Sequence, residues 1–149
     1  MFSKTSEYAL RATIYIAQKS SEEKKLGIDE ITRAINSPRH FTAKILQTLT
    51  RGDVISSIKG PNGGFYISDK QRLLSVKAVL VALDEYAVLE KCVLGLNECS
   101  ETKPCPMHAQ YKLIKPQLQK LFDSRTIQSL ADDIKSGGVF IKSSAKRKP

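Results

Sequence analysis

The segment Gly60-Pro-Asn-Gly-Gly64 constrains the fold more than any other stretch of this chain. Its three glycines permit positive φ angles, and Pro61 stiffens the turn. The residues on either side, Val54 to Ile58 and Phe65 to Ser68, alternate with period two and favour strands. We therefore predict a short β-hairpin closed by this turn.

Three helices are predicted upstream of the hairpin. Apolar residues at helical spacing indicate the first, from Ser6 to about Lys19. Gly27-Ile-Asp-Glu30 is typical of a helix start, with a permissive cap residue and a glutamate three positions on. Ser37 is the expected cap of a third helix, from Pro38 to about Arg51. Two short helices, a tight turn and a hairpin are the pattern of a winged helix–turn–helix.

The third helix is expected to bury one face and to present the other to DNA. The predicted core face consists of Phe41, Ile45, Leu46 and Leu49. Candidate DNA contacts lie on the outer face and on the hairpin turn, with Arg39, His40 and Thr42 as base contacts and the basic side chains as phosphate contacts. The full set is Ser37, Arg39, His40, Thr42, Lys44, Gln47, Arg51, Lys59, Gly60, Asn62 and Gly63.

The charge of the chain agrees with a polyanionic partner. The formal net charge is +9, which favours nucleic acid. Four of these charges, on Lys142, Lys146, Arg147 and Lys148, lie in a Ser/Lys/Pro tail that we expect to be disordered, and the remainder still carries about +5.

The N-terminus has no apolar signal segment, and the longest apolar run, 78–83, is too short to span a bilayer. We therefore expect a cytoplasmic protein without a membrane partner.

All three cysteines of the chain lie in one short stretch, Cys92-x6-Cys99-x5-Cys105-Pro-Met-His108. Glycine, asparagine, serine and proline between them predict a loop, on which thiolates can converge. An odd number of cysteines in a cytosolic protein argues for metal ligands or free thiolates over disulfides. Three interpretations remain open: an iron–sulfur cluster with one non-cysteine ligand, a structural Cys3His zinc site and incidental thiols. The long gaps disfavour a zinc knuckle.

The second half of the chain is expected to be helical around this loop. Ser75 is the predicted cap of a short helix. Tyr111, Ile114, Leu118 and Leu121 recur at spacings of three and four, which suits a long helix packed against its copy in a dimer or against its own chain. Pro116 should kink that helix or delay its start. A last helix is predicted from Ser124 or Thr126 to Gly137-Gly138.

Two other classes of function fit the thiols less well. Cys105 and His108 are close enough in sequence for a nucleophile–base pair, but no glycine-rich nucleophile turn or third orienting residue accompanies them, so we do not expect an enzyme. A thiol-redox DNA-binding regulator without metal is the other alternative.

Several motifs together point to a known family. They are Tyr8-Ala-Leu-Arg-Ala12, the helix from Pro38 to Leu49, Lys59-Gly-Pro-Asn-Gly-Gly64-Phe, Ala82-Leu-Asp84 and the cysteine loop. With them the chain resembles, from Ser3 to about Ile134, the winged-helix repressors that include the iron–sulfur regulator IscR and the nitric-oxide regulator NsrR.

The resemblance implies a homodimeric repressor of transcription that binds a palindromic operator in double-stranded DNA and has no small-molecule substrate. It implies an iron–sulfur cluster held by Cys92, Cys99 and Cys105, with [2Fe–2S] favoured over [4Fe–4S], that senses nitric oxide, redox state or iron–sulfur status. His108 matches the fourth ligand of IscR-like members, and Glu7 matches the acidic ligand that the partner subunit supplies in NsrR-like members. The chain departs from the IscR pattern in its first cysteine gap, six residues in place of five, and carries Lys59 where arginine is usual.

The expected fold is therefore mainly α with a small β-hairpin wing. We predict a winged helix–turn–helix domain in 1–83, a cysteine-containing cluster loop in 84–109, dimerisation and C-terminal helices in 110–136, and a basic disordered tail in 137–149.

Overall fold

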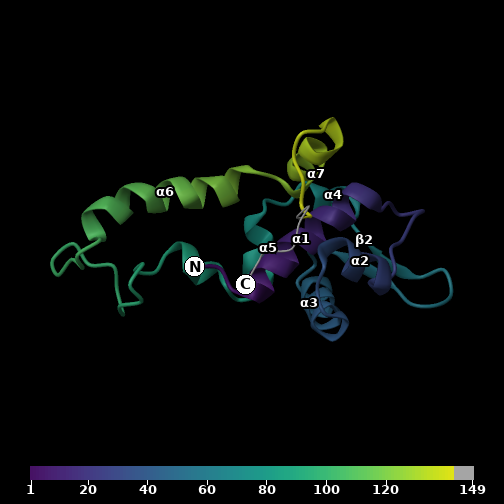
Figure 1. The fold of residues 1–149 in the computed structure, drawn as a ribbon, viewed down its shortest axis with the longest axis horizontal. Helices are drawn as coiled ribbons and strands as arrows, with labels where there is room; N and C mark the ends of the chain where they lie inside the picture. The colour runs from purple at the N-terminus through teal and green to yellow at the C-terminus, as the bar shows by residue number, and fades with distance from the viewer. Residues whose placement is uncertain (143–149) are drawn as a thin grey trace, which may run out of the picture.

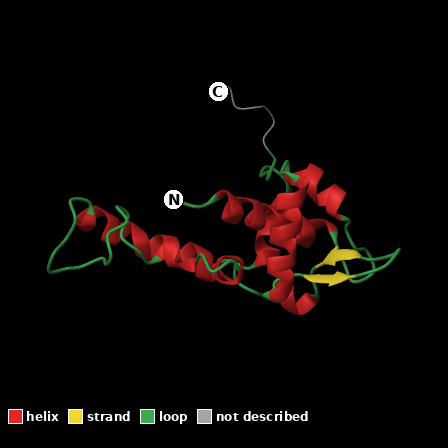
Figure 2. Cartoon of the chain, turned by 90° about the horizontal axis from the view of Figure 1, so that it is seen from below, coloured by secondary structure: helices red, strands yellow, loops and turns green. Residues whose placement is uncertain are grey.

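The computed structural model describes residues 1–142. The chain is mainly helical with one two-stranded antiparallel sheet, which confirms the predicted fold class. Figure 1 shows a helical body from which one helix, α6, extends as an arm with a loop at its far end. Figure 2 shows the small sheet at the end of the body opposite the arm.

Three helices form the centre of the body, and α1 packs against both others. They are α1 (Lys4–Lys19), α2 (Ile28–Ile35) and α3 (Arg39–Arg51). Their core side chains, among them Ile16 and Leu46, are fully buried. The first helix starts two residues before the predicted Ser6, because the Ser3 hydroxyl accepts a hydrogen bond from the Ser6 N–H and caps it.

The turn between α2 and α3 differs from the prediction in its cap. Asn36 ends α2 in the left-handed region at φ 53°, and the N-cap of α3 is Pro38. Ser37 is therefore wrong as the cap, and its hydroxyl instead contacts that of Thr42. Phe41 is also wrong as a core residue, since it is 36% exposed. Its ring packs edge-on against Tyr8 at 5.9 Å between centroids.

The hairpin is shorter than predicted and closes as expected. β1 (Ser56–Ile58) pairs antiparallel with β2 (Gly64–Tyr66). The flanking Val54, Ile55 and Ile67 leave the ladder and enter the core. In the turn, a Cβ on Gly63 would lie 2.0 Å from the Ile58 carbonyl oxygen, so this position requires glycine.

Two short helices and a 3₁₀ turn follow the wing. α4 (Asp69–Arg72) was not predicted, although Ser68 and Gln71 form a capping box at its start. α5 (Lys77–Ala82) has Val76 at its N-cap, so Ser75 is wrong as that cap; Ser75 forms a β-bridge with Thr126. The 3₁₀ turn η1 (Tyr86–Leu89) leads into the cysteine loop.

The last two helices are α6 (His108–Ser124) and α7 (Ile127–Ser136). Pro116 lies inside α6 and does not delay its start. Thr126 caps α7, and Gly137 follows it at φ 92°, which confirms both predicted ends. α7 returns to pack against α1, whereas α6 packs mainly against η1.

Residues 143–149 of the predicted tail lie outside the described residues. No helix in residues 1–142 has the length and hydropathy needed to cross a membrane.

The Arg72 side chain ties α4 to two other helices. Its guanidinium donates hydrogen bonds to the carbonyl oxygens of Ala17 at 2.6 Å and Ser20 at 2.7 Å, and to Gln128 Oε1 at 2.7 Å. The first two acceptors lie at the C-terminal end of α1, and Gln128 lies on α7. The charged Arg72 side chain therefore connects the first and the last helix of the chain.

We predict that Arg72→Met lowers the free energy of unfolding by about 2–4 kcal/mol, because carbonyls of the body lose a charged donor. Urea denaturation followed by circular dichroism measures the change. Lys70→Met, an exposed change of the same kind on α4, should shift it by less than about 0.5 kcal/mol. Equal stability of the Arg72 variant and the unmodified protein would contradict the assigned role.

Candidate metal centre and nucleic-acid interface

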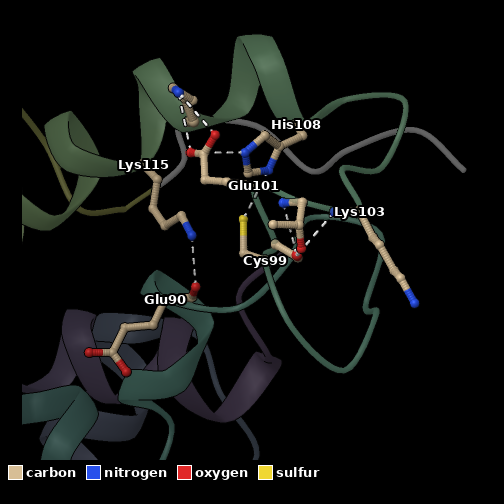
Figure 3. Close-up of polar contacts among 9 residues, drawn as sticks. Glu90, Cys99, Glu101, Lys103, His108 and Lys115 are labelled. Atoms are coloured by element: carbon tan, nitrogen blue, oxygen red, sulfur yellow. Dashed lines mark hydrogen bonds and ion pairs between the residues drawn. The ribbon is translucent and has the colours of Figure 1, made fainter.

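The loop between η1 and α6, residues 90–107, is fastened to α6 at both ends. At its start, Lys115 Nζ donates to the Glu90 carbonyl at 2.9 Å, and Gln119 Nε2 donates to the Leu89 carbonyl at 3.0 Å (Figure 3 shows the first). At its end, the His108 N–H donates to the Cys105 carbonyl at 3.0 Å. The three cysteines are therefore held beside the first half of α6.

The four predicted ligands of this chain meet in two pairs. Cys92 Sγ lies 3.8 Å from Cys105 Sγ, and Cys99 Sγ lies 3.4 Å from His108 Nδ1 (Figure 3). Two sulfurs at about 2.3 Å from one tetrahedral ion are about 3.8 Å apart. Each pair is thus spaced as neighbouring ligands of one centre would be.

The two pairs do not form one closed site. Within residues 1–142 no three histidine, cysteine or acidic side chains converge as metal ligands. The donor set itself suits a soft centre, because thiolate and imidazole bind zinc and the iron of iron–sulfur clusters. The residues therefore fit such a group in chemistry and in pairwise spacing, and joining the pairs requires a rearrangement within the loop.

The surroundings of Cys92 favour its thiolate. This side chain is 2% exposed, and the backbone amides of Leu96, Leu94 and Gly95 lie in the turn that follows it. Hydrogen bonds from these amides, and then from the Cys105 thiol, lower the pKa of the Cys92 thiol. The thiolate is the form that binds metal.

His108 is 7% exposed at the start of α6 and has a second partner that the sequence did not indicate. Its Nε2 lies 3.2 Å from Glu101 Oε1 (Figure 3). Lys112 Nζ lies 3.2 Å from the same oxygen. The imidazole of His108 at this distance, and then Lys112, lowers the pKa of the Glu101 carboxyl. Only the path of the loop brings Glu101 to the helix, so spacing gave no signal for it.

Glu7, the other predicted ligand, lies on α1 and forms an exposed ion pair with Lys4 at 3.2 Å. The enzyme alternative required Cys105 beside His108. In the structure the imidazole contacts Cys99, and Cys105 contacts Cys92. The proposed nucleophile–base pair is therefore not formed.

Most predicted DNA-contact residues are exposed on α3 and on the wing. Gln47, Arg51 and Lys59 line one groove between the two elements. Arg39 is exposed and holds Asp29 through an ion pair at 2.8 Å. The exposed members of the predicted set are Arg39, His40, Lys44, Gln47, Arg51, Lys59, Gly60 and Asn62, while Gly63 is half-buried.

Two predicted contact residues face inward. Thr42 is fully buried, and its hydroxyl donates to the Pro38 carbonyl at 2.9 Å. Ser37 is 8% exposed and contacts the same hydroxyl. Their side chains stabilise the start of α3, so neither is available to touch DNA in this conformation. The helical pattern alone did not separate these hydroxyls from the outward-facing ones.

A family model described as "Rrf2: Iron-dependent Transcriptional regulator" matches residues 2–133. The chain belongs to the Rrf2 family. This confirms the resemblance and the winged-helix interpretation, and it places the chain among transcriptional regulators, which bind DNA and are not enzymes.

Two curated Rrf2-type relatives illustrate the similarity. A protein of Aquifex aeolicus described as an HTH-type transcriptional regulator is 31% identical over 132 residues, 87% of this chain and 90% of that protein. The regulator NsrR of Geobacillus kaustophilus is 27% identical over 129 residues, 86% of this chain and 87% of the relative.

Two solved structures share the fold. CymR of Bacillus subtilis, named the global cysteine regulator of that organism, aligns with a TM-score of 0.70 at 19% identity, over 89% of this chain and 97% of its own. IscR of T. potens aligns with a TM-score of 0.67 at 15% identity, over 91% and 89%.

We predict that Lys59→Ala and Arg51→Ala each weaken binding to DNA from the chain's own promoter region. Each lost phosphate contact should reduce the slope of log affinity against log salt by about 0.9. Fluorescence anisotropy over a salt series measures both quantities. Lys135→Ala, an exposed change on α7, should leave the slope unchanged, and unaltered slopes for the Arg51 and Lys59 variants would remove the groove from the interface.

Proposed function

We propose that this Rrf2-family protein is a homodimeric repressor whose DNA binding depends on an iron–sulfur cluster held by Cys92, Cys99 and Cys105, with His108 as the fourth ligand. A [2Fe–2S] cluster is favoured over [4Fe–4S]. The observation that carries the proposal is that three thiols and one imidazole meet as two pairs at the start of α6. In each pair the two atoms are as far apart as neighbouring ligands of one metal ion. The signal is nitric oxide, redox state or iron–sulfur status.

The description of the family as iron-dependent supports iron over zinc in this site. The ligand spacing in the sequence also disfavours a zinc knuckle, because structural zinc sites usually have short gaps of about two to four residues. Here six and five residues separate the three cysteines. A second candidate is a metal-free thiol switch, which the 3.8 Å contact between Cys92 and Cys105 favours.

A route from the loop to DNA runs through the start of α1. The Glu85 carboxylate precedes η1 and accepts a hydrogen bond from the Ser3 hydroxyl, the group that caps α1. α1 packs against α3, so a movement of 85–92 reaches the helix that lies on DNA. When bound, the cluster supplies a redox- and nitric-oxide-sensitive link between the loop segments. The cysteines hold those segments together, and a small shift in half-site spacing weakens operator binding.

The arm supplies the proposed dimer contact. α6 has 17 residues, so it is about 25 Å long. Leu113, Ile114 and Leu121 on it are 66%, 53% and 52% exposed. Apolar side chains at these positions suit burial against a second copy. The loop would then lie near the partner's body, which carries Glu7, the residue that matches the acidic ligand of NsrR-like members.

The proposed functional division follows from this arrangement: DNA binding in 1–83, the cluster loop in 84–109, and dimerisation and C-terminal helices in 110–136. α7 belongs to the body by its contacts, because it packs against α1. The basic tail, 137–149, stays a prediction beyond Lys142.

The cluster proposal predicts a coloured protein after oxygen-free purification, with iron and sulfide bound in equal amounts. Cys105→Ala should lose most of the visible absorption, because three thiolates are needed. His108→Ala should change the spectrum, whereas Glu7→Gln should leave it unchanged. Colourless protein with stoichiometric zinc would favour the structural site. Colourless, metal-free protein whose free thiols fall on mild oxidation would favour the thiol switch.

The dimer proposal predicts that the double variant Ile114→Asp/Leu121→Asp weakens self-association by at least about 10-fold, since two buried charges would face each other. Analytical ultracentrifugation measures the association, and circular dichroism verifies the fold. Lys135→Asp on α7 is the matched control. A double variant that remains dimeric would exclude this face of α6 as the interface.

A further inference from the structure

His108 presents its two ring nitrogens to two different groups. Nδ1 lies 3.4 Å from Cys99 Sγ, and Nε2 lies 3.2 Å from Glu101 Oε1. A neutral imidazole carries one proton, and the group beside each nitrogen decides where it resides. A carboxylate accepts a hydrogen bond and cannot donate one when ionised. Glu101 therefore favours the tautomer with the proton on Nε2, which leaves the Nδ1 lone pair directed at the Cys99 sulfur.

The Glu101 carboxylate is itself held in place. Lys112 Nζ lies 3.2 Å and 3.3 Å from its two oxygens, and Lys112 follows His108 by one turn of α6. The backbone around Glu101 forms a tight turn, in which the Ser100 hydroxyl accepts hydrogen bonds from the N–H groups of Thr102 at 3.2 Å and Lys103 at 3.1 Å. The Glu101 side chain is 69% exposed; its carboxylate contacts the helix through Lys112, and the Ser100 turn orders the backbone that carries it.

We propose that Glu101 is a positioning residue that sets the tautomer and the ring orientation of His108, and so makes Nδ1 the nitrogen offered to a centre bound by the cysteines. Carboxylates behind ligating histidines do this in metal sites generally, and their loss costs about 10- to 100-fold in metal affinity. The role toward a bound centre rests on the proposed function. The effect on the tautomer does not.

The first test uses the metal-free protein. The chain has two histidines, and nitrogen-15 NMR of the imidazole rings resolves both at about pH 7.5, where a free imidazole is mostly neutral and a free thiol mostly protonated. We expect His108 to carry its proton on Nε2. Glu101→Ala should give a mixture of tautomers, while Glu101→Asp, which keeps an acceptor-only carboxylate, should retain the Nε2–H form. His40 provides an internal reference. A wild-type His108 protonated on Nδ1, or a tautomer unchanged in Glu101→Ala, would overturn the proposal.

The second test measures binding of Co²⁺ to the same apoprotein, by absorption in competition with a chelator. We expect about 10-fold weaker binding in Glu101→Ala and recovery in Glu101→Asp, which keeps the carboxylate. Glu98→Ala is the matched control, because Glu98 is an exposed acid of the same loop without a hydrogen bond or ion pair to the described residues. Equal affinity of Glu101→Ala and wild type would overturn the positioning role.

The two proposals fail separately. If wild-type protein assembles no iron–sulfur cluster but the tautomer and Co²⁺ results hold, the cluster is wrong and the role of Glu101 stands. If the cluster assembles and Glu101→Ala matches wild type in tautomer and Co²⁺ affinity, the role of Glu101 is wrong and the cluster stands.

Discussion

The attachment of α6 to the body is the constraint on which the rest of the structure depends. Phe122 anchors the helix in a cluster with Val76, Leu80 and Leu89. Gln119 and Lys115 then bind the carbonyls of Leu89 and Glu90, where the cysteine loop begins. The same helix supplies His108 and the exposed apolar face. One packing contact therefore sets the position of the ligands, of the proposed dimer face and of the link to η1.

That arrangement places the proposed cluster site and the proposed DNA-contact elements far apart along the molecule. The wing and α3 lie at one end, and the loop lies at the far end of the arm (Figures 1 and 2). A centre in the loop acts on DNA only through contacts that cross the body or the dimer. The Glu85 contact with Ser3 is one such connection. This contact ends on the Ser3 cap, so it joins the segment before the loop to the start of a whole helix.

Local patterns predicted the long elements well and their boundaries less well. Periodicity found α1, α2, α3, α6 and α7, because each has an apolar face that the core requires. Caps were harder. Ser37 and Ser75 are good cap residues by type. However, the Ser37 hydroxyl contacts the Thr42 hydroxyl, and the Ser75 backbone forms a β-bridge with Thr126. α4 was missed because its four residues carry no periodicity. Phe41 was misplaced because the aromatic contact with Tyr8 does not require full burial.

By itself, the amino-acid sequence determined the kind of protein. It has a helix–turn–helix with a glycine-dependent wing, and a loop with three cysteine thiols that leads directly to one histidine. These features are local, so composition and spacing express them directly. Only the tertiary structure decided which ligands meet. It paired Cys92 with Cys105 and Cys99 with His108, turned Thr42 inward, and brought Glu101 to the second nitrogen of His108. A glycine- and proline-containing loop has many conformations of similar energy, and its contacts with α6 select one of them.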